Sequence, residues 1–316
     1  MEGIIHRSVK VNGIRMHVAE KGEGPVVCSS TASRSSGTRG ATRSSASPTP
    51  DTEPSRPTCA DTGTPTPLPP CPTTPSSTSW ATSSPSSTPS ASNRPVFVVG
   101  HDWGAVVAWN LCLFRPDRVK ALVNLSVPFR PRNPTIKPVD YYRSLHGDDH
   151  YICRFQEHGV VEEQFVQFGI DALHKAFFSS LNPGPFSIPK EGLQWPKDQI
   201  SLPSWLSEED IKYFASNFEK TGFTNPINYY RNIDLNWELT EPWTGAQIQV
   251  PTKFIVGDRD LVYNYPGVPD YVLKGGFKKH VPLLEPVVVM PGVGHWINQE
   301  KPQEITEHIR EFIRKF

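Results

Sequence analysis

An aspartate stands between two glycines in the stretch G-H-D-W-G at residues 100–104. It follows an apolar run at 95–100 that is typical of a buried strand, and it precedes a helical pattern that begins at Ala105. A strand, a sharp turn and a helix around the spacing G-x-D-x-G match the nucleophile elbow, in which the two backbones come too close for a Cβ atom. The pattern therefore predicts that Asp102 is a nucleophile.

A carboxylate at this position predicts a particular chemistry. The serine that esterases and lipases carry there attacks acyl carbon, whereas a carboxylate displaces a group from saturated carbon and leaves an alkyl ester. Epoxides and alkyl halides are the natural substrates of such a displacement. The alternative is that Asp102 is an ordinary residue of a strand-helix turn, or the N-cap of the helix.

Hydrolysis of an alkyl ester needs a base, and two later segments contain candidates. The stretch G-D-R-D at 257–260 follows a predicted strand at 252–256, and His295 follows a predicted strand at 287–290. The carboxyl ends of parallel strands are where α/β sheets place their sites. The chain order of nucleophile, acid and histidine predicts that His295 activates water and that Asp260 orients its ring.

Two alternatives to this assignment stay open. Asp258 lies two residues from Asp260 and is the competing acid. Taken alone, His295 would be an ordinary loop or surface histidine, which is how we interpret the other histidines of the chain.

Hydrophobic periodicity indicates the elements that position these residues. Residues 6–20 alternate apolar and polar side chains around Asn12-Gly13, which predicts a β-hairpin. The segment 118–129 supplies the strand that follows the elbow helix. At the end of the chain, five apolar side chains fall at helical spacing and are expected to pack on the sheet: Ile305, Ile309, Phe312, Ile313 and Phe316.

The segment from Cys28 to Asn93 differs in composition from the rest of the chain. It is dominated by Ser, Thr and Pro, and its only large apolar side chains are Leu68 and Trp80. So little apolar surface does not offset the entropy of ordering the segment. As printed, residues 28–93 are predicted to be disordered.

We interpret this segment as the product of a shifted reading frame rather than as a natural linker. In the frame shifted by two bases, each codon joins the wobble base of one residue to the first two bases of the next. Read in this way, residues 28–43 permit L-F-H-G-F-P-E-L-W-Y-S-W-R-H-Q. Residues 51–65 and 77–90 likewise permit strings whose apolar periodicity the printed residues lack.

The overall composition argues against several classes of function. In the 316-residue chain, 32 Lys and Arg balance 32 Asp and Glu, so no net field attracts nucleic acid or an anionic membrane. No apolar stretch reaches the roughly 18 residues of a membrane span, and the first residues lack the apolar region of a secretory signal. We therefore expect a cytoplasmic protein without nucleic-acid or membrane partners.

Several stretches resemble the soluble epoxide hydrolases of the α/β-hydrolase superfamily, those of the plant cytosol above all. They are HVAEKGEGP, VFVVGHDWGAVVAWNLCLFRPDRVKALVNLSVPF, DDHYICRFQ, SWLSEEDI, TGFTNPINYYRN, NWELTEPWTGAQIQVPTKFIVGDRDLVY and GHWINQEKPQEI. The resemblance covers residues 1–27 and 94–316. The shifted-frame strings are similar to the same family.

The resemblance implies an α/β class protein with the α/β-hydrolase fold, which is a mostly parallel sheet with helices on both faces and an inserted helical cap. The implied parts are residues 1–27 and 94–128 for the first part of the core, 28–93 for the anomalous segment, 129–245 for the cap and 246–316 for the last part of the core.

The resemblance also implies two acids in the cap. Family members hold two tyrosines above the nucleophile, and the motifs DDHYICRF and NYYRN place them at Tyr151 and Tyr230, with Tyr229 as the competing neighbour. Two phenol O–H groups can bind and protonate the alkoxide that forms when an epoxide opens. Without the resemblance, a tyrosine in such a helix is more often simply packed in the core.

The family's oxyanion hole combines the backbone N–H after the nucleophile, here that of Trp103, with an N–H from an H-G-F-P motif. As printed, S-T-A-S at 30–33 stands where that motif belongs. Loss of one such donor slows catalysis roughly 10²- to 10³-fold, and the expected second and third strands and first two helices are also missing, so we expect the printed chain to be inactive or unstable. We also predict that the side chains of Trp103 and Phe129 contact the substrate.

The implied activity is hydrolysis of a fatty-acid or other lipophilic epoxide to a vicinal diol, with water as the second substrate and with no metal or organic cofactor. A monomer or a homodimer is expected. A haloalkane or haloacid dehalogenase shares the aspartate elbow, but the paired tyrosines argue against it because halide release needs N–H donors rather than an acid. The other alternative is a non-catalytic binding protein of the same fold.

The shifted-frame interpretation predicts a compensating pair of insertions or deletions near codons 28 and 93. Sequencing the genomic DNA and the transcript across these codons measures it, and the shifted frame should read through the H-G-F-P string. Nucleotide sequences with no such pair would contradict the interpretation.

Overall fold

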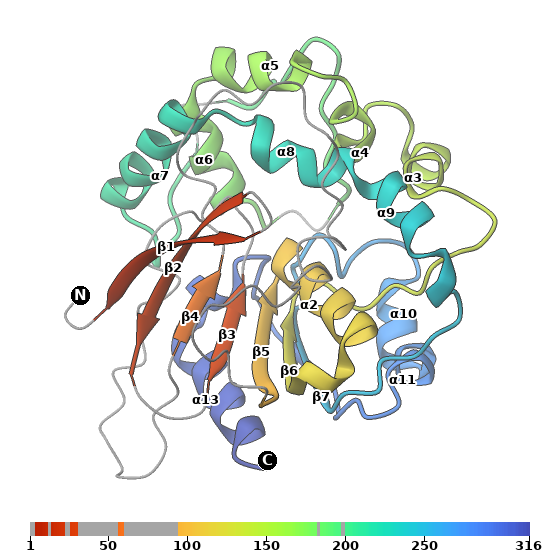
Figure 1. Ribbon diagram of the computed structural model, residues 1–316. Helices are drawn as coiled ribbons and strands as arrows, with labels where there is room; N and C mark the ends of the chain where they lie inside the picture. The colour runs from red at the N-terminus through yellow and green to blue at the C-terminus, as the bar shows by residue number, and fades with distance from the viewer. Residues whose placement is uncertain are drawn as a thin grey trace.

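The computed structural model describes residues 4–11, 14–22, 26–30, 56–59, 94–181, 184–196 and 200–316. Within these residues eight strands form one sheet in the order β1-β2-β4-β3-β5-β6-β7-β8 (Figure 1). The pairs β1–β2 and β2–β4 are antiparallel, and the later neighbours are parallel. The strands are β1 (Ile5–Val11), β2 (Ile14–Lys21), β3 (Val27–Ser30), β4 (Arg56–Cys59), β5 (Val96–His101), β6 (Val119–Leu125), β7 (Thr252–Gly257) and β8 (Val288–Met290).

Helices cover the sheet, and further helices form a second layer above one end of its parallel strands. They are α2 (Trp103–Phe114), η2 (Pro116–Arg118), α3 (Pro138–His146), α4 (Tyr151–Arg154), α5 (Val160–Phe168), α6 (Ile170–Ser179), α7 (Glu208–Thr221), α8 (Thr224–Arg231), α9 (Ile233–Leu239), η4 (Glu241–Trp243), α10 (Val268–Leu273), α11 (Gly276–His280), α12 (Ile297–Glu300) and α13 (Pro302–Ile313). No helix in the described parts of the chain is both long and apolar enough to cross a bilayer.

The predicted α/β-hydrolase architecture is confirmed in its main features. Val11 of β1 pairs with Ile14 of β2, so the two strands form the expected hairpin across residues 12–13. The strands predicted before the elbow, at 252–256 and at 287–290 are β5, β7 and β8, with ends that differ by one residue. The elbow helix begins at Trp103, two residues earlier than predicted.

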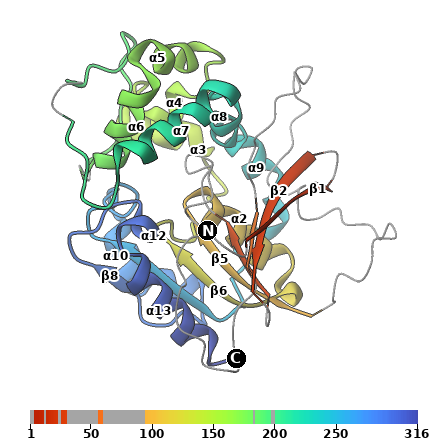
Figure 2. The same cartoon turned by 90° about the vertical axis from the view of Figure 1, so that its left-hand side faces the viewer.

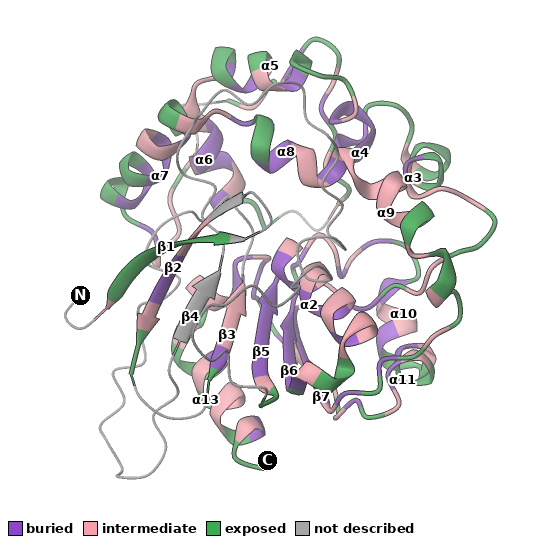
Figure 3. Cartoon of the chain, in the orientation of Figure 1, coloured by how far each residue is buried: buried purple, intermediate pink, exposed green. Residues whose placement is uncertain are grey.

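The central parallel strands are buried on both faces (Figure 3), as expected where helices cover both sides of a sheet. Val98 and Leu122 belong to a core shared with α2, α10 and α11. Val99 and Val123 belong to the opposite core, which α13 covers. Because neighbouring side chains of a strand point to opposite faces, one apolar run supplies both cores.

The terminal helix α13 confirms most of the predicted apolar face. Ile305 and Phe312 are buried against the sheet, and Ile309 and Ile313 pack beside them. Phe316 was predicted to join them and is instead 44% exposed. The helix ends at Ile313, so the helical spacing that would turn Phe316 inward does not extend to it.

The prediction of disorder across residues 28–93 is wrong for two short pieces. Cys28–Ser30 continue β3 and pair in parallel with β5, and Arg56–Cys59 form β4 between β2 and β3. Most backbone N–H and C=O groups can pair in this way with little dependence on the side chain, although Pro57 of β4 has no N–H to donate. Apolar content therefore underestimated the ordered structure of these two pieces. Residues 31–55 and 60–93 lie outside the described residues.

Helices α3 to α9 lie between β6 and β7 in the chain and form a layer above one end of the parallel strands (Figures 1 and 2). At the start of α7, Ser207 and Asp210 form a capping box in which each side chain bonds the backbone N–H of the other. The layer contains α4 and α8, which carry Tyr151 and Tyr230. The cap boundaries at 129 and 245 stay a prediction.

Substitution of Gly100 by alanine should damage the elbow. A Cβ atom at this position would lie 2.7 Å from the Cα of Ala105 and 2.7 Å from the carbonyl oxygen of Gly104, both of which are backbone atoms. Such overpacking costs about 1–3 kcal/mol. We expect Gly100→Ala to lower the free energy of unfolding by that amount in urea denaturation, and an unchanged value would show that the two backbones can separate.

Candidate active site

The turn between β5 and α2 holds Asp102 in a strained conformation. Its φ of 54° and ψ of −122° lie in a region that residues with a side chain rarely adopt. The carbonyl oxygen of Asp102 accepts the N–H groups of Ala105 and Val106 at 2.9 and 3.2 Å, so the strained residue also begins the helix. Strain of this kind persists where the surrounding fold imposes it, and it is frequent at reactive residues.

His295 lies between two carboxylates. Its Nδ1 is 2.9 Å from Oδ2 of Asp260, and its Nε2 is 3.3 Å from Oδ1 of Asp102. The Asp260 side chain is completely buried, and its other oxygen accepts the N–H of Val262 at 2.7 Å. The three residues predicted from chain order are therefore brought together in one row.

The competing acid Asp258 faces a different partner. Its Oδ1 accepts the N–H of Gly292 at 2.7 Å, which ties the end of β7 to the turn after β8. Asp260, rather than Asp258, contacts the ring of His295.

The environment of His295 favours its protonated form. Burial of the ring lowers the pKa, but the charge of Asp260 and the hydrogen bonds and charges of both carboxylates together raise the pKa of His295 to about 10. The imidazolium is therefore an ion-paired group at neutral pH, held between Asp102 and Asp260.

The loop that carries His295 is fixed by residues that sequence analysis missed. The carbonyl oxygen of His295 accepts hydrogen bonds from Nε2 of His101 at 2.8 Å and from Oγ of Ser126 at 3.2 Å. Burial lowers the pKa of His101 to about 4, so its ring is neutral and can donate. Glu300 accepts the N–H groups of Gly294 and Trp296 on either side of His295.

No sequence signal marked these supporting residues. His101 adjoins the nucleophile but has no spacing rule of its own, and we interpreted it as an ordinary histidine. Ser126 follows β6 with a φ of 69°, which single-sequence patterns do not reveal.

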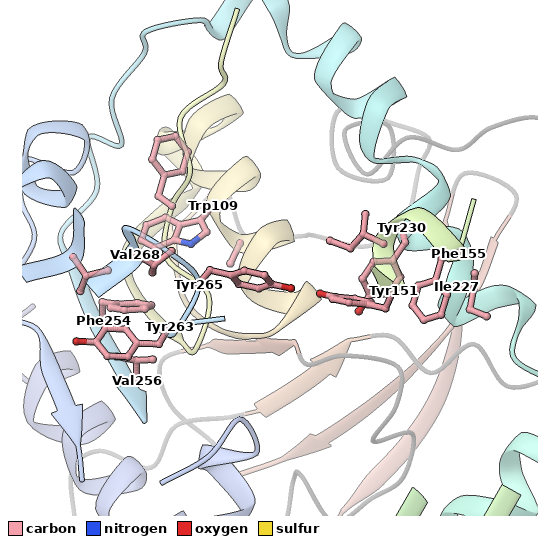
Figure 4. Packing of buried hydrophobic residues seen from close by; sticks show 14 of the residues in the cluster. Trp109, Tyr151, Phe155, Ile227, Tyr230, Phe254, Val256, Tyr263, Tyr265 and Val268 are labelled. Carbon is pink, nitrogen blue, oxygen red and sulfur yellow. The ribbon is translucent and has the colours of Figure 1, made fainter. Parts of the chain in front are cut away.

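Tyr151 and Tyr230 come from different helices and meet at one cavity. Their ring centroids are 5.5 Å apart in an edge-to-face arrangement, and Figure 4 shows the two rings side by side. A cavity of about 560 Å³ is lined by both tyrosines together with Asp102 and His295. Tyr229, the competing neighbour, is not among the residues that line it, and its ring packs 5.4 Å from that of Trp103.

Burial keeps the phenol of Tyr151 in its neutral form. Desolvation, followed by neighbouring tyrosines and Asp102, raises the pKa of Tyr151 well above its usual value. The hydroxyl of Tyr265 points towards Tyr151 (Figure 4) and lies 2.8 Å from Nε2 of His150. A neutral phenol retains the proton that a general acid must deliver.

Neither of the two predicted substrate contacts is among the residues that line the cavity. Trp103 lies behind it, where its ring packs edge-to-face on Tyr230 at 5.0 Å, and its backbone N–H lies in the first turn of α2, where no helical carbonyl precedes it. Phe129 lies against Trp109 at 5.7 Å and is not among the cavity-lining residues, so this arrangement offers no support for its predicted substrate contact. Residues 31–33, the printed counterpart of the second oxyanion donor, lie outside the described residues.

The walls of the cavity are mainly aromatic and aliphatic, with several hydroxyl groups. Phe177, Phe186 and Trp195 face Leu261 and Val262 across it. Ser179, Ser180, Ser187 and Ser201 also line it. Among the described residues, no group of three or more His, Cys, Asp and Glu side chains is arranged to hold a metal ion.

Comparison with known proteins agrees with the geometry. The model of the alpha/beta hydrolase family matches residues 52–308. Epoxide hydrolase 3 of Siraitia grosvenorii is 58% identical over 222 residues, or 70% of each chain, and epoxide hydrolase A of Mycobacterium tuberculosis is 34% identical over 226 residues, or 68% of this chain and 67% of its own.

Solved structures align along the whole length. An epoxide hydrolase from Vigna radiata has a TM-score of 0.80 at 44% identity and covers 100% of this chain and 99% of its own. Potato epoxide hydrolase I has a TM-score of 0.81 at 40% identity and covers 99% of this chain and 100% of its own. The chain therefore belongs to the alpha/beta hydrolase family, and its relatives there include the epoxide hydrolases of plants.

Proposed function

We propose that this protein hydrolyses lipophilic epoxides to vicinal diols through an ester on Asp102. The observation that carries the proposal is the cavity in which a nucleophilic carboxylate and its histidine face two buried phenols. The relatives named above are epoxide hydrolases, which supports the same activity for this chain.

The first step is ring opening. A carboxylate oxygen of Asp102 attacks an epoxide carbon, the ring C–O bond breaks, and the released oxygen takes a proton from Tyr151 or Tyr230. An alkoxide is far more basic than a phenolate, so the proton moves from the phenol to the released oxygen and neutralises its developing charge. The product of the step is an alkyl ester on Asp102 that carries a neighbouring hydroxyl group.

The second step is hydrolysis of that ester, and the charge state of His295 controls it. Esterification removes the negative charge of Asp102, one of the two carboxylates that raise the pKa of His295. The imidazolium then gives its proton to the phenolate left by ring opening, and the neutral ring takes a proton from water. The hydroxide adds to the ester carbonyl, where the Trp103 N–H would bind the oxyanion, and the acyl C–O bond breaks. The leaving alkoxide takes the proton of the new carboxylic acid, which frees the diol and restores the Asp102 carboxylate.

The aromatic and aliphatic walls of the cavity suit a lipophilic epoxide, although they do not select one. A dehalogenase would share Asp102, His295 and Asp260. The paired phenols favour epoxides, because a halide leaves as a stable anion and needs no proton. A non-catalytic binding protein would not need a strained nucleophile aligned with a base.

The described residues keep the sheet order and bring Asp102, His295 and Asp260 together, so in place of inactivity we expect weak turnover. The full chain at high concentration should convert trans-stilbene oxide to its diol and release no bromide from a bromoalkane. Asp102→Asn should lower turnover about 10⁴-fold, which is a typical loss when an essential member of a catalytic triad is removed. Asp258→Asn is the matched control, because Asp258 contacts Gly292 rather than His295, and it should retain activity within a few-fold. Product is measured by chromatography, and bromide release without diol would establish the dehalogenase instead.

Isotope transfer tests the ester directly. In H₂¹⁸O with enzyme in excess over the epoxide, the first diol formed should contain no ¹⁸O, since its new oxygen comes from Asp102 while water oxygen enters the carboxylate. Diol labelled in that first turnover would mean that water attacks the epoxide itself.

The raised pKa of His295 predicts how stability depends on pH. The folded protein holds this proton up to a pH of about 10, whereas the unfolded chain releases it near 6.5, so the stabilisation is complete below pH 6.5 and is lost as the pH rises towards 10. Asp260→Asn removes one of the charges that raise the pKa of His295. The free energy of unfolding of this variant should therefore fall less between pH 6.5 and pH 10. The lowered pKa of His101 acts below pH 6.5, outside this window.

Urea denaturation at intervals between pH 6.5 and 10 measures these slopes. Asp258→Asn should keep the wild-type slope, because Asp258 does not contact the ring. Identical slopes for the wild type and Asp260→Asn would show that His295 is not held as an imidazolium by this carboxylate.

A further inference from the structure

We propose that Arg231 and Gln156 are positioning residues that fix where the phenols of Tyr151 and Tyr230 lie relative to each other. The inference rests on the proposed function, because it concerns the acid pair Tyr151 and Tyr230. Its basis is a set of hydrogen bonds that connects the two short helices carrying these tyrosines.

Arg231 follows Tyr230 directly and reaches from α8 to the chain after α4. Its Nε donates to the carbonyl oxygen of Phe155 at 2.8 Å, and its Nη2 donates to that of Glu157 at 3.0 Å. Phe155 is the C-cap residue directly after α4, and its N–H donates to the carbonyl oxygen of Tyr151 at 2.9 Å. The guanidinium therefore satisfies carbonyl groups at the end of the single turn that begins with Tyr151.

Gln156 makes the reverse connection. Its Nε2 donates to the carbonyl oxygen of Tyr230 at 3.2 Å and to that of Ile152 at 2.8 Å. One side chain from each segment thus bonds the backbone of the other. Such reciprocal bonds fix both the separation and the relative rotation of the two backbones.

Glu162 of α5 supports the arginine. Its carboxylate lies 2.9 Å from Nη2 of Arg231, and the two side chains are only 12% and 7% exposed. A buried guanidinium without a counter-charge would be strongly destabilising, so Glu162 makes this placement of Arg231 possible. The remaining Nη1 donates to Oδ1 of Asn228 within α8.

The tyrosines need such support because their helices are short. α4 has four residues and α8 has eight, and isolated helices below about 12 residues are marginal in water. The rings of Tyr151 and Tyr230 meet edge-to-face at 5.5 Å, with Trp103 and Phe155 beside Tyr230. Aromatic packing alone would still let the two rings slide past each other. A displacement of about 1 Å at a catalytic group can cost roughly 100-fold in rate.

The experiment separates ring opening from ester hydrolysis. Purified full chain, in excess over trans-stilbene oxide, is quenched at successive times, and intact-protein mass spectrometry follows the rise and decay of the Asp102 adduct. The variants are Arg231→Met, Arg231→Lys and Gln156→Met, with Lys175→Gln as the matched control. Lys175 pairs with Glu208 between α6 and α7 in the same helical layer, and it is not among the residues that line the cavity.

We expect Arg231→Met and Gln156→Met to slow adduct formation roughly 10- to 100-fold while adduct decay, which depends on His295, changes by less than about threefold. Arg231→Lys keeps the charge beside Glu162 but loses the forked donors, so it should be intermediate. Lys175→Gln should leave both steps unchanged. If Arg231→Met does not fold, Gln156→Met and Arg231→Lys carry the test.

A double-mutant comparison distinguishes positioning from a general loss of structure. In a Tyr230→Phe background, where the phenol is absent, each substitution should have a much smaller further effect on adduct formation, because coupled residues are not additive. Equal effects in both backgrounds, or equal slowing of formation and decay, would overturn the inference. Wild-type protein that forms no adduct would instead refute the proposed function.

Discussion

The rest of the site depends on the ion pairs that protonated His295 makes with Asp102 and Asp260. The two carboxylates keep the imidazole charged at neutral pH, and the charged ring in turn stabilises a nucleophile and a completely buried acid. In the proposed mechanism, covalent attack by Asp102 removes one of these charges and releases the base when water is needed. The order of the two proposed steps is thereby linked to the charge state of His295.

The fold divides the chemistry between two layers. After the ends of β5, β7 and β8 the parallel sheet brings together Asp102, Asp260 and His295, the proposed nucleophile, acid and base. The close approach of two backbones at Gly100 adjoins the strained turn at Asp102. The helical layer supplies two phenols, those of Tyr151 and Tyr230, held by aromatic packing and, in our proposal, by the bonds of Arg231 and Gln156. Residues of both layers line the cavity between them.

The segment with anomalous composition shows how far side-chain patterns can mislead. Its apolar content predicted no ordered structure, yet Cys28–Ser30 of β3 and the four residues of β4 complete the sheet order between β2 and β5. Backbone hydrogen bonding to a neighbouring strand is available to almost any residue, whereas burial of a helix requires apolar side chains. The family match across the whole chain in solved structures agrees with this preserved order.

By itself, the sequence determined the elbow at Asp102, the order of nucleophile, acid and histidine, and the strands that carry them, because glycine spacing and apolar periodicity are local signals. Only the resemblance to the epoxide hydrolases added Tyr151 and either Tyr230 or its neighbour Tyr229 as the proposed acids of the cap. Only the tertiary structure decided that Asp260 and not Asp258 reaches His295, that Tyr230 and not Tyr229 lines the cavity, and that His101 and Ser126 hold the histidine loop. These outcomes depend on directions in space between residues distant in the chain, and no local pattern encodes such directions.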